Sequence, residues 1–370
     1  MQFIDLKRQF EHLRPAIEGR ISNVLGHGQF ILGPEVQEFE QALADYCGVN
    51  HAIGVGNGTD ALQLTLMAAG VGPGDAVFTS AFSFFASAEV ISLVGATPVF
   101  VDIDEHTYNI SPEALKDAVE TVALRGELAP RAIIAVDLFG LPADYDRISA
   151  VAEDHGLVLV EDAAQSFGGA IGSRKSGSFG HMAATSFFPA KPLGCFGDGG
   201  AVFTNDDALA ELLRSLRVHG KGRDKYDNVR IGLNSRLDTL QAAILLAKFA
   251  ELPAELEARQ RWADEYGARL AQKFIVPRLP PDTRSAWAQY TVRPRSGDRE
   301  ACIAKLADHG VPTAIYYGKP LHLQPAFAHL GGHEGQFPVA ERCAATVFSL
   351  PMHPYLRADE VDAVVNGLLK

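Results

Sequence analysis

The first 50 residues carry the hydrophobic spacing of two amphipathic helices. In the first, apolar residues recur every three or four positions and stop at the glycines 26 and 28: Leu13, Ile17, Ile21, Val24 and Leu25. In the second, Pro34 stands where a helix begins, and the apolar stripe ends before Gly48: Val36, Phe39, Leu43 and Tyr46. Both segments are therefore expected to pack one face against a core.

From residue 52 onward, short apolar runs alternate with helical patterns. Strands are expected at residues 52–55, 76–79, 98–102, 131–136, 157–161 and 201–204. Helices are expected at residues 59–69, 85–93, after Ser111-Pro112, at about 145–155 and at 207–217. Continuously apolar strands that alternate with helices are typical of strands buried on both faces. The pattern predicts an α/β fold with a mostly parallel central sheet, covered by helices on both sides.

The C-terminal third of the chain reads differently. A helical pattern runs from residue 238 to about 273 and is interrupted by Pro253, which should bend or break it. Beyond it, strands are expected at residues 289–292 and 313–316, a helix at 299–309 and a last helix from 358 to the end. These patterns predict a large domain at residues 1–248 and a smaller α+β domain at residues 249–370.

Composition and charge narrow the class of protein. The chain has 370 residues, of which 47% are hydrophobic and 21% charged, a balance that can build a sizeable core. The formal net charge of −12 disfavours a nucleic-acid or anionic-membrane surface. The four cysteines are far apart, so neither a disulfide framework nor a metal site is expected. No signal peptide or membrane-length apolar run is visible, and a cytoplasmic protein is expected.

Open α/β sheets bind ligands beyond the carboxyl ends of their strands, and the first such turn is rich in glycine. Residues 54–60 read Gly-Val-Gly-Asn-Gly-Thr-Asp and lead straight into a helix. Bare backbone amides at a helix N-terminus, together with the Thr59 hydroxyl, suit a phosphate. The spacing matches neither the P-loop nor the G-x-G-x-x-G pattern, and a purely structural turn is the alternative.

Two further turns carry an aromatic cluster and a pair of acids. Residues 80–84 end on Phe84, whose ring either packs in the core or stacks on a planar cofactor. Glu161 and Asp162 follow the most apolar strand, and strand alternation sends them to opposite faces, so only one can point into a site. An aspartate that faces a pyridine nitrogen keeps it protonated and makes the ring an electron sink. An acid that caps the following turn is the alternative.

Lys191 lies in a run with few polar neighbours, between Phe187-Phe188-Pro189 and Pro192, before a glycine-rich turn. Apolar surroundings lower the pKa of a lysine, and the neutral amine can form an imine with a carbonyl such as the aldehyde of pyridoxal phosphate. A surface lysine in a proline-bracketed loop is the alternative. The order along the chain of phosphate turn, aromatic ring, acid and lysine favours the pyridoxal phosphate hypothesis.

These motifs resemble the fold-type I pyridoxal-phosphate enzymes, which have the aspartate-aminotransferase-like fold, and among them the DegT/StrS-type nucleotide-sugar aminotransferases. The likeness covers essentially the whole chain and is strongest in four segments: residues 56–62, 161–168, 186–200 and 234–241. Relatives that use the cofactor for dehydration carry histidine at the position of Lys191, whereas this chain has lysine there. The resemblance therefore implies a transaminase with pyridoxal 5′-phosphate as its cofactor.

The resemblance also assigns roles to individual residues. It implies that Lys191 bonds the cofactor as an imine and later moves the substrate proton. The other cofactor contacts that it implies are Gly58, Thr59 and Ser186 at the phosphate, Phe84 on the ring, Asp162 at the pyridine nitrogen, Gln165 at the ring oxygen and Asn234 at the phosphate of the neighbouring subunit's cofactor. That last contact implies a homodimer with shared active sites.

The substrate is expected to be an anionic nucleotide sugar. Residues 214–236 hold seven basic side chains, Lys225 among them, against two aspartates, a local charge of +5 that is either a solvated loop or a diphosphate site. Arg236 is the best single contact because it lies beside Asn234. Within the family, the chain is most similar to UDP-2-acetamido-2-deoxy-3-oxo-glucuronate aminotransferases, at residues 28–34, 187–195 and 349–355. Those enzymes use L-glutamate to aminate C3 of the sugar for surface polysaccharide (O-antigen) synthesis.

One departure from the family concerns the sugar site. Relatives usually have His-Tyr-Pro where this chain has Tyr316-Tyr317-Gly318. Tyr316 and Tyr317 are expected to contact the sugar nucleotide, and Tyr316 can donate a hydrogen bond but carries no positive charge near pH 7. Two alternatives stay open: a dTDP-3-keto or 4-keto-6-deoxyhexose as the substrate, and a non-catalytic regulatory protein that binds pyridoxal phosphate.

Overall fold

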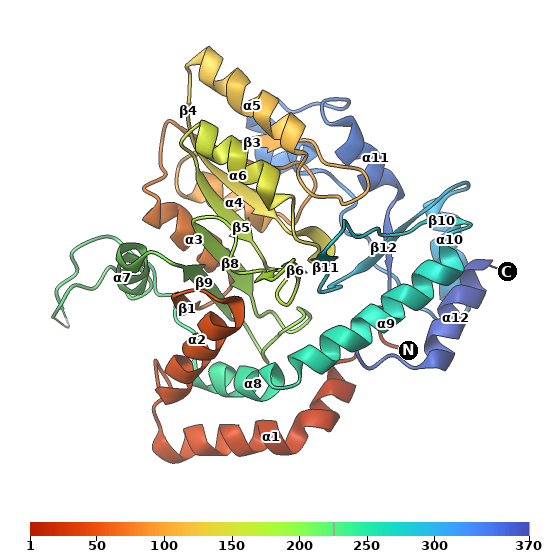
Figure 1. Cartoon of the computed structure of the whole chain (residues 1–370), viewed down its shortest axis with the longest axis horizontal. Coiled ribbons are helices and arrows are strands. Elements are labelled where there is room, and N and C mark those ends of the chain that lie inside the picture. The colour runs from red at the N-terminus through yellow and green to blue at the C-terminus, as the bar shows by residue number, and fades with distance from the viewer. Residues whose placement is uncertain (225, 370) are drawn as a thin grey trace.

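A seven-stranded sheet forms the centre of the computed structural model, which describes residues 1–224 and 226–369 (Figure 1). The strand order is β1-β9-β8-β5-β4-β2-β3. The strands are β1 (His51–Val55), β2 (Asp75–Ser80), β3 (Thr97–Val101), β4 (Ala129–Val136), β5 (Val158–Asp162), β8 (Met182–Ser186) and β9 (Gly200–Thr204). Only β9 runs antiparallel to its neighbours, β8 and β1. The prediction of a mostly parallel sheet is confirmed.

Helices cover both faces of this sheet. They are α2 (Pro34–Cys47), α3 (Gly58–Ala68), α4 (Ala86–Leu93), α5 (Pro112–Arg125), α6 (Tyr145–Asp154), α7 (Asp207–Leu216) and α8 (Thr239–Phe249), and α1 (Leu6–His27) packs on the outside of α8. On β4, Ala132 and Ile134 join the core under α3, α4 and α7, whereas Ile133 and Ala135 join the core under α5 and α6. Because both faces of the strand are buried from residue 132 to 136, its sequence is apolar at each of those positions.

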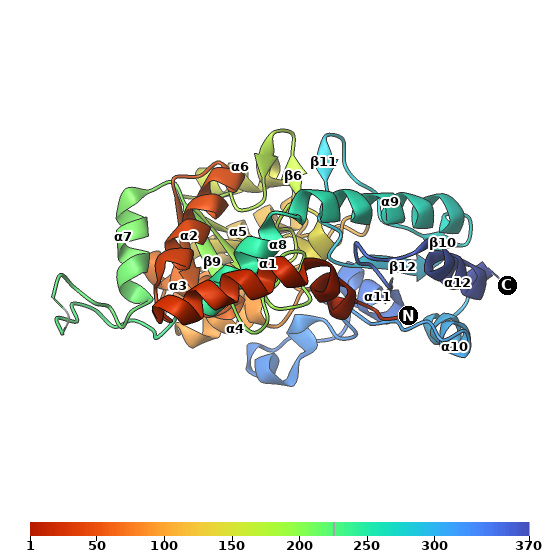
Figure 2. The same ribbon diagram turned by 90° about the horizontal axis from the view of Figure 1, so that it is seen from below.

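The chain bends at residues 250–251, where the long helical pattern divides into α8 and α9 (Leu252–Leu270). Pro253 lies in the first turn of α9, where a missing backbone N–H breaks no helical hydrogen bond. Figure 2 shows α9 running from the central sheet toward α10 and α12. This part contains β10 (Phe274–Ile275), β12 (Tyr290–Pro294), α10 (Arg299–Asp308), α11 (Pro338–Thr346), β13 (Phe348–Leu350) and α12 (Ala358–Leu369). Its apolar side chains form a separate core cluster.

The strand expected at residues 313–316 is wrong. Only one bridge forms there, between Ala314 and Ser349, and the strand that pairs with β12 is β13 instead. The chain leaves the sheet after this bridge because Tyr316 and Tyr317 turn toward other aromatic rings: Tyr316 packs on Phe3, and Tyr317 packs on Phe82 and Phe84. The alternating pattern of this segment thus reflects packing between rings.

Several smaller elements complete the fold. They are β6 (Ala170–Ile171), β7 (Arg174–Lys175), β11 (Thr283–Arg284), η1 (Leu138–Gly140), η2 (Leu321–Leu323) and η3 (Pro325–Leu330). Within the described residues, no helix has the length and apolar character of a membrane span. The same part of the chain holds no group of three or more His, Cys, Asp or Glu side chains suited to a metal ion. Lys370, at the end of the expected last helix, lies outside the described residues.

Candidate active site

Four strands of the central sheet that run in the same direction, β1, β2, β5 and β8, lead to candidate site residues. Gly58, Phe84 and Lys191 follow β1, β2 and β8, and Asp162 is the last residue of β5. Because parallel strands end at the same edge of a sheet, these residues gather at that edge. The glycine at 58 makes the closest approach: a Cβ atom there would lie 2.6 Å from the Cβ of Ser186. The two predicted phosphate segments therefore touch.

The N-terminus of α3 presents donors at this edge. Asn57 is its N-cap and accepts a hydrogen bond from the backbone N–H of Asp60 at 2.8 Å. The N–H groups of Gly58 and Thr59 lie in the first helical turn, where no carbonyl of the helix can accept from them. Free amides and the positive end of the helix dipole favour an anion. The cradle is suited to a phosphate group.

Asp162 lies at the end of β5 and is only 4% exposed. Its Oδ2 accepts from the hydroxyl of Ser87 at 2.8 Å, and its Oδ1 accepts from the backbone N–H of Ala164 at 3.2 Å. Burial raises the pKa of this carboxyl, while the Ser87 hydrogen bond and the Lys191 charge oppose the rise. Both donors stabilise the carboxylate form, which is the form that can hold a proton on a pyridine nitrogen.

Glu161, the preceding residue, points to the other face of the strand. Its Oε1 accepts from the backbone N–H of Gly177 and its Oε2 from that of Phe179, each at 2.8 Å. Burial and the neighbouring Asp137 raise the pKa of Glu161 well above its ordinary value. The expectation that strand alternation separates the two acids is confirmed, because they share none of these partners.

Lys191 is half-buried, and its backbone N–H donates to the carbonyl of Phe188 at 2.9 Å. Burial lowers the pKa of the amine, and the carboxylate of Asp162 opposes this effect. Phe187 is fully buried, as expected of an apolar wall, but Phe188 is 52% exposed and does not enclose the lysine. A lysine with a lowered pKa keeps a larger neutral fraction, which is what bond formation with an aldehyde requires.

Gln165, which is expected to contact the cofactor, and Tyr317, which is expected to contact the sugar nucleotide, lie next to each other. The Gln165 Oε1 accepts from the backbone N–H of Phe139 at 2.8 Å, and its Nε2 donates to the Tyr317 hydroxyl at 3.3 Å. The centroid of the Tyr317 ring lies 6.2 Å from that of Phe84. Phe84 is 53% exposed, so much of its ring surface is open to a planar ligand. Tyr316 packs between Phe3 and Tyr317.

Asn234 and Arg236 contact each other on the connection between α7 and α8. The Arg236 guanidinium donates to the Asn234 side-chain oxygen, and Asn234 is exposed. Between them, the Ser235 hydroxyl accepts from the backbone N–H of Gly56 at 2.9 Å and ties the segment to the phosphate turn. Within one chain, Gly58 lies against Ser186, Gln165 bonds to Tyr317, Asn234 bonds to Arg236, and the charges of Asp162 and Lys191 influence each other.

The basic stretch at residues 214–236 is not one uniform anion site. Arg217 is 7% exposed, pairs with Glu40 and donates to the carbonyl of Gly54 at 2.8 Å, so it holds β1 in place. Arg230 donates to Ser215. Lys225 lies outside the described residues. Arg236 remains half-buried beside the phosphate turn, where a ligand can reach its guanidinium.

Two supporting residues were not predicted from the sequence. Ser87 donates to Asp162 from the first turn of α4, and its place between two alanines at the start of the helix is the signal that could have found it. Asp137 is fully buried after β4, and its Oδ2 accepts from the Ser166 hydroxyl at 2.6 Å. It thereby fixes the turn that carries Gln165. No sequence motif distinguishes Asp137 from a loop acid.

The residues present fit pyridoxal 5′-phosphate. The α3 amides and Ser186 suit its phosphate, Phe84 its ring face, Asp162 its pyridine nitrogen and Lys191 its aldehyde. The fold and this donor set define a fold-type I pyridoxal-phosphate-dependent transferase. A family model for the DegT/DnrJ/EryC1/StrS aminotransferase family matches residues 12–369, and the chain belongs to that family.

Individual relatives span the whole chain. A UDP-2-acetamido-2-deoxy-3-oxo-D-glucuronate aminotransferase of Pseudomonas aeruginosa is 47% identical over 369 residues, which cover 100% of this chain and 99% of the relative. A pleiotropic regulatory protein of Geobacillus stearothermophilus is 44% identical, over 99% of this chain and 96% of the relative. The crystal structure of a DegT DnrJ EryC1 StrS aminotransferase from Brucella abortus has a TM-score of 0.97 and 53% identity, over 100% of this chain and 98% of that one.

Proposed function

We propose that this sugar aminotransferase moves the amino group of L-glutamate to C3 of UDP-2-acetamido-2-deoxy-3-oxo-glucuronate. The observation that carries the proposal is the pairing of Lys191 with Asp162, a lysine of lowered pKa facing a buried carboxylate. The choice of sugar rests on the 47% identity to the Pseudomonas aeruginosa enzyme over the full chain. The family's sugar aminotransferases use pyridoxal 5′-phosphate.

The chain's own residues divide the work as follows. Bound pyridoxal phosphate supplies an electron sink that makes the Cα–H bond of an amino acid acidic. Asp162 holds the proton on the pyridine nitrogen, and Ser87 keeps the Asp162 carboxylate oriented. Lys191 Nζ removes the proton from the Cα of glutamate, a role that the lowering of its pKa by burial favours because it enlarges the neutral fraction of the amine. Gly58, Thr59 and Ser186 bind the phosphate, while Phe84 and Gln165 position the ring.

A homodimer with shared active sites is part of the proposal. Asn234 is exposed at the base of the α7–α8 connection, which extends away from the rest of the chain (Figures 1 and 2). That connection carries exposed apolar side chains, Val229 and Ile231, which a second copy of the chain would cover. In such a dimer Asn234 would reach the partner's cofactor phosphate, and Arg236 the diphosphate or carboxylate of the sugar.

Two broader expectations belong to the same proposal. The division into residues 1–248 and 249–370 would put the cofactor contacts on the large domain and Tyr316 and Tyr317 on the small one. A cytoplasmic site of action, in the supply of an amino sugar for surface polysaccharide, agrees with a nucleotide-sugar substrate.

A substrate panel tests the sugar. The protein loaded with pyridoxal phosphate is given L-glutamate and, separately, UDP-2-acetamido-2-deoxy-3-oxo-glucuronate, a dTDP-3-keto and a dTDP-4-keto-6-deoxyhexose. We expect the highest kcat/KM for the UDP-uronate, with an amine at C3 of the product by mass spectrometry. A higher kcat/KM for either dTDP sugar would replace the sugar assignment and leave the aminotransferase chemistry intact.

The second candidate is a regulatory protein that binds the cofactor without turnover, and the printed name of the Geobacillus stearothermophilus relative is the observation that favours it. The same loaded protein distinguishes the two. A catalyst converts glutamate to 2-oxoglutarate and loses the yellow absorbance of its cofactor, whereas a regulatory protein keeps its colour. We expect the colour to be lost.

A further inference from the structure

A small cavity lies against Lys191, and its other polar lining groups are ones that the proposed reaction does not use. Its volume is about 10 Å³, close to the least that holds one water molecule. The polar side chains that line it are Asp5, Gln9, Lys191, Arg259, His353 and Tyr355. Such a cavity is too small for a substrate, so any occupant is the size of water.

Two of these side chains are deeply buried and have nitrogen atoms without a partner. His353 is 2% exposed, and neither of its ring nitrogens has a hydrogen-bond partner among the described residues. Arg259 is 3% exposed; its NH1 group donates to the carbonyls of Trp287 and Met352, at 3.0 and 3.1 Å, but its Nε finds no acceptor among those residues. Buried polar atoms are rarely left unpaired, because the loss of water costs free energy.

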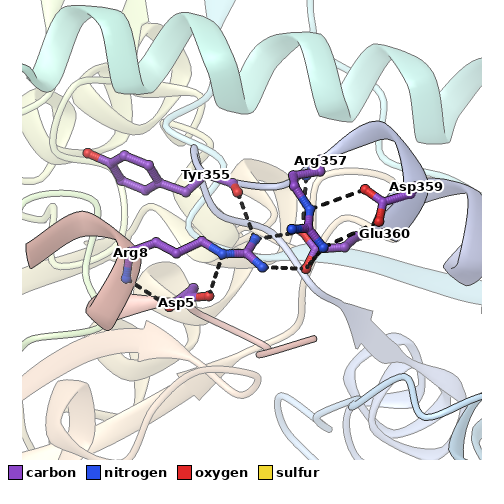
Figure 3. Close-up of polar contacts among 6 residues, drawn as sticks. All are labelled: Asp5, Arg8, Tyr355, Arg357, Asp359 and Glu360. Atoms are coloured by element: carbon purple, nitrogen blue, oxygen red, sulfur yellow. Dashed lines mark hydrogen bonds and ion pairs between the residues drawn. The ribbon is translucent and has the colours of Figure 1, made fainter. Parts of the chain in front are cut away.

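The walls of the cavity are fixed by interactions that Figure 3 shows. Arg8 forms an ion pair with Glu360 at 2.7 Å and donates to the carbonyl of Tyr355 at 3.1 Å. Its backbone N–H donates to the carboxylate of Asp5 at 3.0 Å. The Tyr355 hydroxyl donates to Glu255 at 2.7 Å. The start of α1 and residues 353–360 are thus held together, and the space beside Lys191 is preformed.

The unpaired atoms match the hydrogen-bonding capacity of one water molecule. Burial and the Arg259 charge lower the pKa of His353 to about 4, so its ring is neutral at pH 7 and has one bare nitrogen that accepts. The Arg259 Nε–H can donate to the water oxygen, and the water can donate to His353 and to the lone pair of a neutral Lys191 amine. Three partners are typical of a buried water.

We propose that this cavity holds one ordered water molecule that joins His353 and Arg259 to Lys191, and that His353 is thereby a positioning residue for the catalytic lysine. A water held by a guanidinium donor and an imidazole acceptor keeps a hydrogen directed at Lys191 Nζ, which favours the neutral amine. Charged groups on the surrounding elements also influence the pKa of His353 or of Lys191. They are Asp5, Arg8, Asp162, Arg259 and Glu360.

The test measures Lys191 itself in the cofactor-free, full-length protein. Competitive acetylation across a pH series, followed by mass spectrometry of the Lys191 peptide, gives the pKa of that amine, with exposed Lys116 as the internal reference. In His353→Phe we expect a roughly tenfold change in the ionisation equilibrium, a rise of about one pH unit, because a hydrogen bond to the neutral amine is lost. His353→Asn keeps an acceptor and should stay close to the wild type.

His322→Phe is the matched control, because His322 is also 2% exposed but lines a different cavity, beside β3. An unchanged Lys191 pKa in His353→Phe, or an equal rise in His322→Phe, would overturn the proposal. If His353→Phe does not fold, a high-resolution crystal structure of the wild type decides: a water peak within hydrogen-bond distance of His353 and Lys191 supports it, and a dry cavity refutes it.

This inference rests on the proposed role of Lys191 but fails separately from it. The lysine titration uses no cofactor, so it can give a negative result while the substrate panel succeeds. The proposal also predicts a change in the protein with cofactor bound. In His353→Phe, the acidic limb of the pH profile of kcat should move to higher pH, while the KM for glutamate changes little.

Discussion

Asp162 and Lys191 lie at the buried end of the central sheet, whereas Asn234 and Arg236 lie on the exposed connection between α7 and α8. The first pair is fixed by its own chain, through Ser87, Ala164 and the backbone carbonyl of Phe188. In the second pair, Asn234 and Arg236 contact each other, and Ser235 between them ties the segment to the phosphate turn. From this difference we propose that the buried pair carries the chemistry and that the exposed pair, which can vary without harm to the core, binds the substrate.

The largest effect should come from the buried pair. Lys191→Ala is expected to lower kcat by about a thousandfold or more, because it removes both the bond to the cofactor and the group that moves the proton. Loss of the glutamate-dependent absorbance change measures this. Lys116→Ala, on the exposed face of α5, is the control and should behave as wild type. Full turnover in Lys191→Ala would remove the proposed active site.

Asp162→Asn tests the second member of that pair. We expect kcat to fall about a hundredfold, because an amide cannot hold the pyridine nitrogen in its protonated form as a carboxylate does. The control is Glu161→Gln, one residue away on the opposite face of β5, which should keep most of its turnover. Steady-state kinetics with glutamate compare the two; equal losses would show that the alternation of the strand does not separate their roles.

The exposed pair should affect binding instead. Loss of a charge-assisted hydrogen bond in Arg236→Ala should cost about 1.5–3 kcal/mol, a roughly tenfold to hundredfold rise in KM for the nucleotide sugar. The kcat and the glutamate half-reaction should change little. Arg214→Ala is the matched control, since Arg214 lies in the same basic stretch but faces His51 on the surface. A fall in kcat without a change in KM contradicts the comparison.

The smallest effect concerns how Asp137 and Glu161, two buried acids near the site, make the free energy of unfolding depend on pH. Burial raises the pKa of Asp137 from 3.8 to about 7, and that of Glu161, its hydrogen-bonded neighbour, also rises. An acid whose pKa is higher in the folded chain than in the unfolded chain stabilises the fold at low pH, and this contribution is lost as the pH rises through the folded pKa. For Asp137 the loss falls between about pH 4 and pH 7.

At low pH, one proton can lie between the carboxyl groups of Asp137 and Glu161. Glu161→Gln replaces that proton by an N–H donor that is present at every pH. The free energy of unfolding of this variant should fall less steeply between about pH 4 and pH 7 than that of the wild type. Urea unfolding at several pH values measures both slopes. Parallel slopes would mean that the two acids do not share a proton.

The sequence was most informative where burial dictates it. The strands β2, β4 and β5 are apolar because both of their faces are covered, and Pro253 correctly marked the end of α8. β8 (Met182–Ser186) was not predicted, because Met-Ala-Ala-Thr-Ser has small side chains that indicate no strand. It is a strand because β5 and β9 supply hydrogen bonds on both sides, and partners distant in the chain cannot be read from local spacing.

Site residues followed the same division. Asp162 and Lys191 were predicted from the chain order of their motifs, and the structure brings them close enough to influence each other's pKa. The local pattern at residues 313–316 predicts a strand, yet Tyr316 packs on Phe3, and the next residue, Tyr317, packs on Phe82 and Phe84. Arg217 looked like its basic neighbours until its ion pair with Glu40 placed it inside the protein.

The interaction of Arg8 with Glu360 has a practical consequence. It ties the beginning of the chain to its last helix, next to Asp5 and Tyr355 (Figure 3), two residues that line the Lys191 cavity. Residues at the two ends of the sequence therefore hold each other in place, and a trimmed or extended N-terminus would disturb Lys191, which is far from both ends in the sequence. Affinity tags on this protein are best tested at both ends before any kinetic constant is compared.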